Sequence, residues 1–279
     1  MVNELSLQPR GAARAAGARE NYEGPLVRAV RPTDGAETDI GMMPDGRLDV
    51  RALVRFARGG ETEAAVWYDQ SPAATHWQAV EGVGRPLLTG LDGLPFTLGG
   101  ANRPALRFRD NRGLANLRLA LAGGRNMAVV MVWQFSSIGG SPHLLAFHGD
   151  LQGVGASPRL RLREDGRIGL EQYGNVGMMI SEARPAPDAP IVLGVAYRGG
   201  QEPGHLWWVN GGTGHAAPPS LTWELSRLSV ARLGHNGPSH PTGWHLDGLM
   251  GELYVMEGER TAPATLDRIG RALASDFGV

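Results

Sequence analysis

Residues 21–71 read NYEGPLVRAVRPTDGAETDIGMMPDGRLDVRALVRFARGGETEAAVWYDQS, and the fold is predicted from this stretch. Its three motifs are the block GPLVRAVRPTDGAETDIG at 24–41, the acidic turn DGRLD at 45–49 and WYDQS at 67–71. Behind Asp49, apolar residues recur at helical spacing as far as Arg58, which predicts a short helix capped by the aspartate. Val66–Tyr68 has the composition of a β-strand.

The three motifs stand in the order found in the catalytic domain of the α-L-arabinofuranosidase B family. The chain resembles that family at both ends, over residues 21–110 and 230–279. The family is a branch of the concanavalin A-like jelly rolls, so the resemblance implies an all-β sandwich that handles sugars. Fungal members carry cystines, one of them at the sugar site, whereas this chain has no cysteine. The question becomes whether the chain cuts a glycan or only binds one.

The composition limits the class of protein. With 279 residues, 42% hydrophobic and 20% charged, the chain is long enough for one large all-β domain. A net charge of −1 and a pI of about 6.7 argue against nucleic acid as a partner, because such binders usually carry a basic patch. No apolar run reaches transmembrane length, so we expect no membrane insertion. The lack of cysteine excludes disulfides and thiolate metal sites.

The rest of the chain has the rhythm of a two-sheet sandwich, with 41 glycines and 19 prolines spread between short apolar runs. Residues 127–135 (MAVVMVWQF) predict a central strand buried on both faces. Residues 159–173 predict a hairpin that turns at EDG. Further strands are predicted at 105–108, 190–197, 205–209, 228–233 and 248–256.

A helix is predicted at the C-terminus, over residues 261–277. Its apolar face consists of Leu266, Ile269, Leu273 and Phe277. Thr261 is the predicted cap, and Pro263 suits the first turn. The fold prediction is therefore an all-β, concanavalin A-like jelly-roll sandwich with a short helix near 49–58 and a C-terminal helix.

Residues 1–20 are rich in Ala, Arg and Gly and keep no strand or helix period. We expect an N-terminal arm that docks on a protein partner, or a frayed end, before a single domain at 21–279. The segment lacks the apolar core of a secretory signal. Because such a fold is usually found outside cells, three explanations remain. The chain is a mature form, it is exported by another route, or it is released on the surface of a phage-like particle.

A retaining arabinofuranosidase needs a nucleophilic carboxylate and an acid about 5 Å apart. The residue that best resembles the family's nucleophile is Glu164, for which an ordinary hairpin turn is the simpler interpretation. The family's acid is an Asp followed by Asn, and here His235 and Asn236 stand in that place. An imidazole differs from a carboxylic acid in reach, charge and pKa. Asp247 is the alternative donor, although a turn residue is again the simpler interpretation.

Sugar binding needs a flat aromatic ring against the sugar and polar groups for its hydroxyls. Trp244 is the best candidate, because it stands in a loop rich in His, Pro and Gly together with His235, Asn236 and His245. These four residues form the core of the predicted carbohydrate site.

The other tryptophans divide into further site candidates and predicted core residues. Trp207 and Trp208 are adjacent in a predicted strand, so one of them points outward, and Trp208 is the candidate for a second platform. Trp77 is a candidate for the same edge. Trp67 and Trp133 lie in strand patterns and are predicted to be core.

Clustered histidines can bind a metal. His235, His240 and His245 lie close in sequence, but no helix aligns them, and a polar loop rim is the favoured interpretation. Some laminin-G-like jelly rolls hold calcium through loop oxygens. No dense Asp/Asn run supports calcium here, so we expect no cofactor.

The polar residues of the WYDQS motif have a structural interpretation. Asp69 and Gln70 are expected to brace neighbouring loops through hydrogen bonds. Asp39, in ETDIG, invites the same interpretation.

The leading functional hypothesis is non-catalytic binding of a cell-surface or capsular polysaccharide by a homo-oligomeric spike or fibre of a phage-like particle. Two alternatives stay open. One is a glycoside hydrolase that uses Glu164 with His235 or Asp247, and the other is a purely structural particle protein.

Overall fold

The computed structural model describes residues 2–6, 22–99, 103–119, 126–137, 142–148, 158–172, 178–181, 184–198, 205–210, 215–217, 229–235 and 246–279. Its elements are β1 (Val2–Ser6), β2 (Val27–Arg31), β3 (Ala36–Ile40), α2 (Val50–Ala57), β4 (Thr62–Trp67), β5 (Trp77–Gln78), β6 (Leu87–Thr89), β7 (Thr97–Leu98), β8 (Arg103–Pro104), β9 (Leu106–Phe108), β10 (Leu114–Asn116), β11 (Asn126–Phe135), β12 (His143–His148), β13 (Pro158–Leu162), β14 (Ile168–Gln172), β15 (Met178–Ile180), β16 (Pro190–Arg198), β17 (His205–Val209), β18 (His215–Ala217), β19 (Val230–Leu233), β20 (Gly248–Glu257), the 3-10 helix η3 (Gly258–Thr261) and α3 (Pro263–Phe277). The predicted all-β class with two helices is confirmed.

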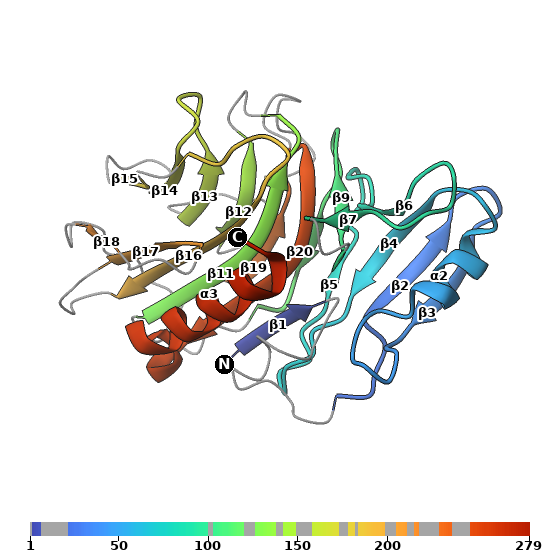
Figure 1. Cartoon of the computed structure of the whole chain (residues 1–279), viewed down its shortest axis with the longest axis horizontal. Helices are drawn as coiled ribbons and strands as arrows, with labels where there is room; N and C mark the ends of the chain where they lie inside the picture. The colour runs from blue at the N-terminus through green and yellow to red at the C-terminus, as the bar shows by residue number, and fades with distance from the viewer. Residues whose placement is uncertain are drawn as a thin grey trace.

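The strands form two antiparallel layers (Figure 1). Layer A has the order β5–β10–β19–β12–β13–β14–β15. Layer B has the order β9–β20–β11–β16–β17–β18. β4 joins the layers, because it pairs with β5 and with β6, and β6 pairs with β9. The sheet therefore curls round on itself.

The main core lies between the two layers, and a second core lies between layer B and α3. Met131 and Trp133 of β11 belong to the first core, whereas the intervening Val130 and Val132 belong to the second. Because β11 is covered on both faces, all of its inner residues are apolar, as predicted. Each large apolar side chain buried in this way contributes roughly 2 kcal/mol.

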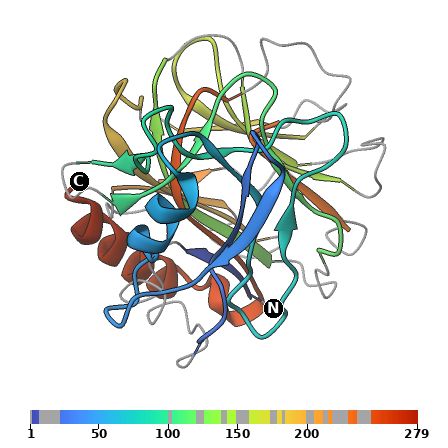
Figure 2. The same cartoon turned by 90° about the vertical axis from the view of Figure 1, so that its right-hand side faces the viewer.

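The two helices cover different parts of the sandwich (Figure 2). α2 packs on β2 and β3, and the Asp49 side chain caps it by accepting a hydrogen bond from Ala52 N at 2.9 Å. It ends at Arg58, which has a left-handed φ of 52°. This confirms the predicted helix and its cap. Among the described residues, no helix combines the length and apolar character that crossing a membrane would take.

α3 lies along the outer face of layer B, with the predicted apolar face buried. Its predicted cap is wrong. The helix begins at Pro263 behind Ala262, which makes no side-chain cap, while Thr261 belongs to η3 and donates to Gly258 O at 2.7 Å. The threonine hydroxyl thus closes the preceding turn instead of the helix.

Residues 2–6 belong to the sheet. They form β1, which pairs antiparallel with β20, Val2 opposite Met256 and Ser6 opposite Glu252. The expectation of an arm without strand structure is therefore wrong for these residues. Residues 7–21, the rest of that segment, lie outside the described residues.

Candidate functional site

One end of the sandwich, which we call the loop end, carries those catalytic candidates that lie within the described residues. Layer A contributes the starts of β10 and β12 and the ends of β13 and β19, because neighbouring strands alternate in direction. Layer B contributes the end of β9 and the start of β20. Leu246 N donates to Gly234 O at 3.2 Å and joins the two layers there.

His235 follows β19 at the loop end and is 0% exposed. Its imidazole packs on Gly113, where a Cβ would collide with His235 Cδ2. Gly113 N in turn donates to Gly84 O at 2.8 Å. The residue predicted in place of the family's acid is thus a buried imidazole, enclosed partly by glycine backbone, and its burial also corrects the prediction that it contacts a sugar.

Glu164 is exposed in the turn between β13 and β14. The turn is closed by hydrogen bonds from Arg163 N to Arg167 O at 2.8 Å and from Gly166 N to Arg163 O at 2.9 Å. The neighbouring Asp165 accepts from Arg167 Nη2 at 2.7 Å, and this hydrogen bond is the main cause that lowers the pKa of Asp165 to about 2. The EDG segment is the predicted hairpin turn.

Glu164 follows β13 and His235 follows β19, and these two strands are separated by β12. Two strand spacings amount to about 10 Å, whereas the carboxyls of a retaining glycosidase lie about 5 Å apart. The alternative donor Asp247 has a different partner, because its Oδ1 lies 2.6 Å from Arg107 Nη2. The strands that precede Glu164 and His235 are thus further apart than the two carboxyls of a retaining pair.

The strand tryptophans are buried. Trp67 and Trp133 lie in the main core, as predicted. Trp77 is 0% exposed and joins them, so its ring faces no ligand. Trp208 does point away from Trp207 and from the main core, but α3 covers it and leaves it 3% exposed. Neither Trp77 nor Trp208 is available as a sugar platform, which corrects both predictions.

The remaining candidates lie in the loop 236–245, outside the described residues: Asn236, His240, Trp244 and His245. Both anchors of that loop, His235 and Leu246, are at the loop end. Within the described ranges, no three side chains of His, Asp or Glu are grouped to hold a metal ion.

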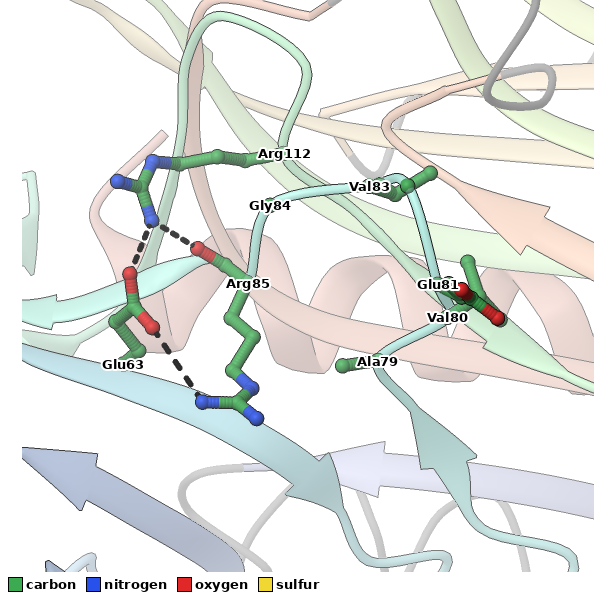
Figure 3. A pocket seen from close by; sticks show the side chains of 9 residues that line it. Glu63, Ala79, Val80, Glu81, Val83, Gly84, Arg85 and Arg112 are labelled. Carbon is green, nitrogen blue, oxygen red and sulfur yellow. Dashed lines mark hydrogen bonds and ion pairs between the residues drawn. The ribbon is translucent and has the colours of Figure 1, made fainter. Parts of the chain in front are cut away.

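A hollow of about 440 Å³ lies beside Arg112, in the segment that leads into β10 (Figure 3). It is lined by Glu63 of β4, by residues 79–85 and by Arg112. Figure 3 shows the charged side chains of Glu63, Arg85 and Arg112 on one side, and Ala79, Val80, Glu81 and Val83 on the other. The hollow is amphiphilic, and none of its lining residues is among the predicted site residues.

The walls of the hollow are fixed by backbone hydrogen bonds. Gly84 N donates to Asn111 O at 2.7 Å, and Asn111 Nδ2 donates to Gly82 O at 3.0 Å. Gly84 O accepts from Gly113 N, and Gly113 packs on His235. The hollow is therefore pre-formed and lies one layer of backbone from His235.

The charged side of the hollow is an uneven ion-pair cluster. Glu63 Oε1 accepts from Arg112 Nη1 at 2.8 Å, and Glu63 Oε2 lies 3.7 Å from Arg85 Nη1. Arg112 Nη1 also donates to the main-chain oxygen of Arg85. Arg112 is therefore fixed by two hydrogen bonds, whereas the contact of Arg85 with Glu63 is longer than a hydrogen bond.

The polar residues of the motif near residue 70 are structural, as predicted. The buried Asp69 carboxylate accepts from Ser71 N, Ser71 Oγ and Thr75 N, each at 2.9 Å. Gln70 is also buried. Asp39 pairs with Arg28 at 2.8 Å, and this hydrogen bond is the main cause that lowers the pKa of Asp39.

The curled two-layer sandwich is shared in fold by solved structures of low sequence identity. The chain is similar to an arabinofuranosidase complexed with arabinofuranosyl-α-1,2-xylobiose, with a TM-score of 0.64 and 16% identity over 97% of this chain and 62% of that one. It is also similar to a GH54 α-L-arabinofuranosidase soaked with a cyclic sulfate inhibitor, with a TM-score of 0.61 and the same 16% identity and coverage of 97% and 62%.

This likeness confirms the predicted resemblance at the level of the fold. The chain spans 62% of the length of these two enzymes. Comparison with protein-family models and with curated proteins gave no match.

Proposed function

We propose that the chain is a non-catalytic glycan-binding domain that takes a cell-surface or capsular polysaccharide at its loop end. The observation that carries the proposal is the burial of His235, whose imidazole is 0% exposed. A general acid has to reach the glycosidic oxygen. A buried imidazole and an exposed hairpin glutamate two strands away favour binding over cleavage.

The hollow beside His235 supports binding. A sugar ring has apolar C–H faces and polar edges, and ligand sites combine an apolar lining with a few fixed polar groups. Here Ala79 and Val80 supply the apolar side, and Glu63 and Arg85 supply the polar one. A volume of about 440 Å³ falls within the usual range for ligand sites, roughly 300–1,000 Å³.

The loop 236–245 is the second part of the proposed site. Its anchor His235 is connected to the hollow through Gly113 and Gly84, and we propose that a glycan in the hollow also contacts this loop. We assign Trp244 as the stacking platform, with Asn236 and His245 as hydrogen-bonding partners for the hydroxyls.

The proposed setting is an extracellular one, on a spike or fibre of a phage-like particle. Single glycan contacts are weak, and a homo-oligomer would multiply them into useful avidity. Light scattering of the purified chain measures the oligomer, and adsorption to capsulated and acapsular cells measures the avidity.

A glycan array that compares the wild type with Trp244→Ala tests the function directly. The buried core tryptophans stay unchanged in both proteins. We expect the wild type to bind a defined subset of glycans and Trp244→Ala to lose at least about tenfold in affinity, since stacking contributes on the order of 1.4 kcal/mol. If no glycan binds, and capsulated and acapsular cells adsorb the protein equally, a purely structural role replaces the proposal.

A further inference from the structure

We propose that the hollow lined by Glu63, residues 79–85 and Arg112 is a subsite for an acidic sugar, whose carboxylate is bound by Arg85. The ligand class is a uronate-containing glycan. This inference rests on the proposed glycan binding and names the kind of sugar that the site selects.

The charge balance of the cluster favours an anion. Two guanidinium groups, of Arg85 and Arg112, share the carboxylate of Glu63, which leaves this cluster one positive charge. Glu81 on the opposite side makes the lining as a whole neutral. Arg112 is committed, because it donates to Glu63 at 2.8 Å and to the main-chain oxygen of Arg85. The remaining charge is therefore centred on Arg85.

Arg85 is placed to use that charge. Its Nη1 lies 3.7 Å from Glu63 Oε2, beyond hydrogen-bonding distance, and its side chain is 39% exposed compared with 21% for Arg112. Figure 3 shows its second terminal nitrogen pointing away from Glu63. A planar guanidinium with an open edge can bind a carboxylate through two parallel hydrogen bonds.

The opposite side of the hollow orients the sugar. The half-buried Ala79 and Val80 offer an apolar surface to the ring, while the exposed Glu81 carries a negative charge away from the guanidinium groups. A uronate ring would therefore turn its carboxylate toward Arg85 and away from Glu81. The backbone hydrogen bonds of Gly82 and Gly84 hold these walls in place before the ligand arrives, which lowers the entropic cost of binding.

The test compares tri-galacturonate with its methyl ester, which keeps the shape and removes the charge, by isothermal titration calorimetry. We expect the wild type to bind the acid at least about tenfold more tightly, on the order of 1.4 kcal/mol, and the difference to shrink as salt is added. Arg85→Gln should abolish the difference, and Glu81→Gln should enlarge it by removing a repulsive charge.

Arg109→Gln is the matched control. Arg109 pairs with Glu61 at 3.4 Å, is 46% exposed and does not line the hollow, so its loss removes the same charge outside the subsite. Circular dichroism confirms that each variant is folded.

Three results would overturn the inference. Equal binding of the acid and the ester, or equal effects of Arg85→Gln and Arg109→Gln, would leave glycan binding intact but remove the acidic subsite. A wild type that binds neutral glycans on the array and not tri-galacturonate would do the same. Failure on every glycan would contradict the proposed function itself.

Discussion

Gly113 lies so close to His235 that a Cβ at position 113 would collide with the imidazole Cδ2 and stand 2.5 Å from Leu233 O. The same glycine donates its N–H to Gly84 O at 2.8 Å. A single residue without a side chain thus allows His235 to be buried and ties it to the wall of the hollow.

The first prediction is that Gly113→Ala destabilises the fold. The added methyl has backbone and a buried ring as neighbours, so we expect the free energy of unfolding to fall by about 1–3 kcal/mol. Urea denaturation measures it. Gly41→Ala is the control, because a Cβ there meets nothing within 4 Å, and it should stay within about 0.5 kcal/mol of the wild type. Equal stabilities of the two variants would refute the close packing.

The second prediction concerns the buried Asp69. Asp69→Asn replaces one accepting oxygen by a donor, so that an N–H or the Ser71 hydroxyl loses its partner, and the free energy of unfolding should fall by about 1–3 kcal/mol. Asp39→Asn breaks an exposed ion pair with Arg28 and should cost less than about 1 kcal/mol. Chemical denaturation of both variants checks the order, and a larger loss for Asp39→Asn would contradict it.

The third prediction concerns pH. His76 Nδ1 accepts a hydrogen bond from Asp69 N at 3.1 Å, and desolvation lowers the pKa of His76 below 6.5, against the opposing charge of Asp69. Between the folded pKa and 6.5 the unfolded chain binds more protons, so stability rises with pH in that window and falls as the pH drops through it.

His76→Gln should therefore flatten the dependence of unfolding free energy on pH below 6.5. Urea titrations at a series of pH values, with the wild type alongside, provide the measurement. Since other histidines also titrate, only the difference between the two slopes is informative. Superimposable slopes would show that His76 has no shifted pKa.

The fourth prediction tests the docking of α3. Phe277 is buried between α3 and layer B, close to Gly251, so Phe277→Ala should cost about 3–5 kcal/mol. Arg271→Ala removes only an exposed pair with Asp267 on the same helix and should cost less than about 0.5 kcal/mol. Thermal unfolding separates the two variants, and comparable melting temperatures would mean that α3 does not contribute to the core.

Local patterns predicted much of the fold. The span of β17, the hairpin of β13 and β14, and the doubly buried β11 follow from residue type and period alone. β1 was missed because five residues are too few to establish a period. The burial of Trp208 was missed because strand alternation shows that a side chain points outward, but not that a helix from the end of the chain covers it.

The site was harder to predict than the fold. Glu63 and Arg112 are 49 residues apart in sequence, and only the closure of β4, β6 and β9 brings them together. Sequence position predicted His235 in the place of the family's acid, but it could not predict that the imidazole is buried. The burial of His235 depends on close packing against Gly113, which lies in a different loop. No sequence motif links these two residues.

The central claim is that the loop end binds a glycan without cutting it, and the most direct test measures both on one sample. The glycan selected on the array is titrated calorimetrically, and the same mixture is assayed for new reducing ends and for turnover of a chromogenic arabinofuranoside. We predict saturable binding, no product, and the same affinity for Glu164→Gln. Turnover by the wild type that disappears in Glu164→Gln would contradict the account and establish a hydrolase.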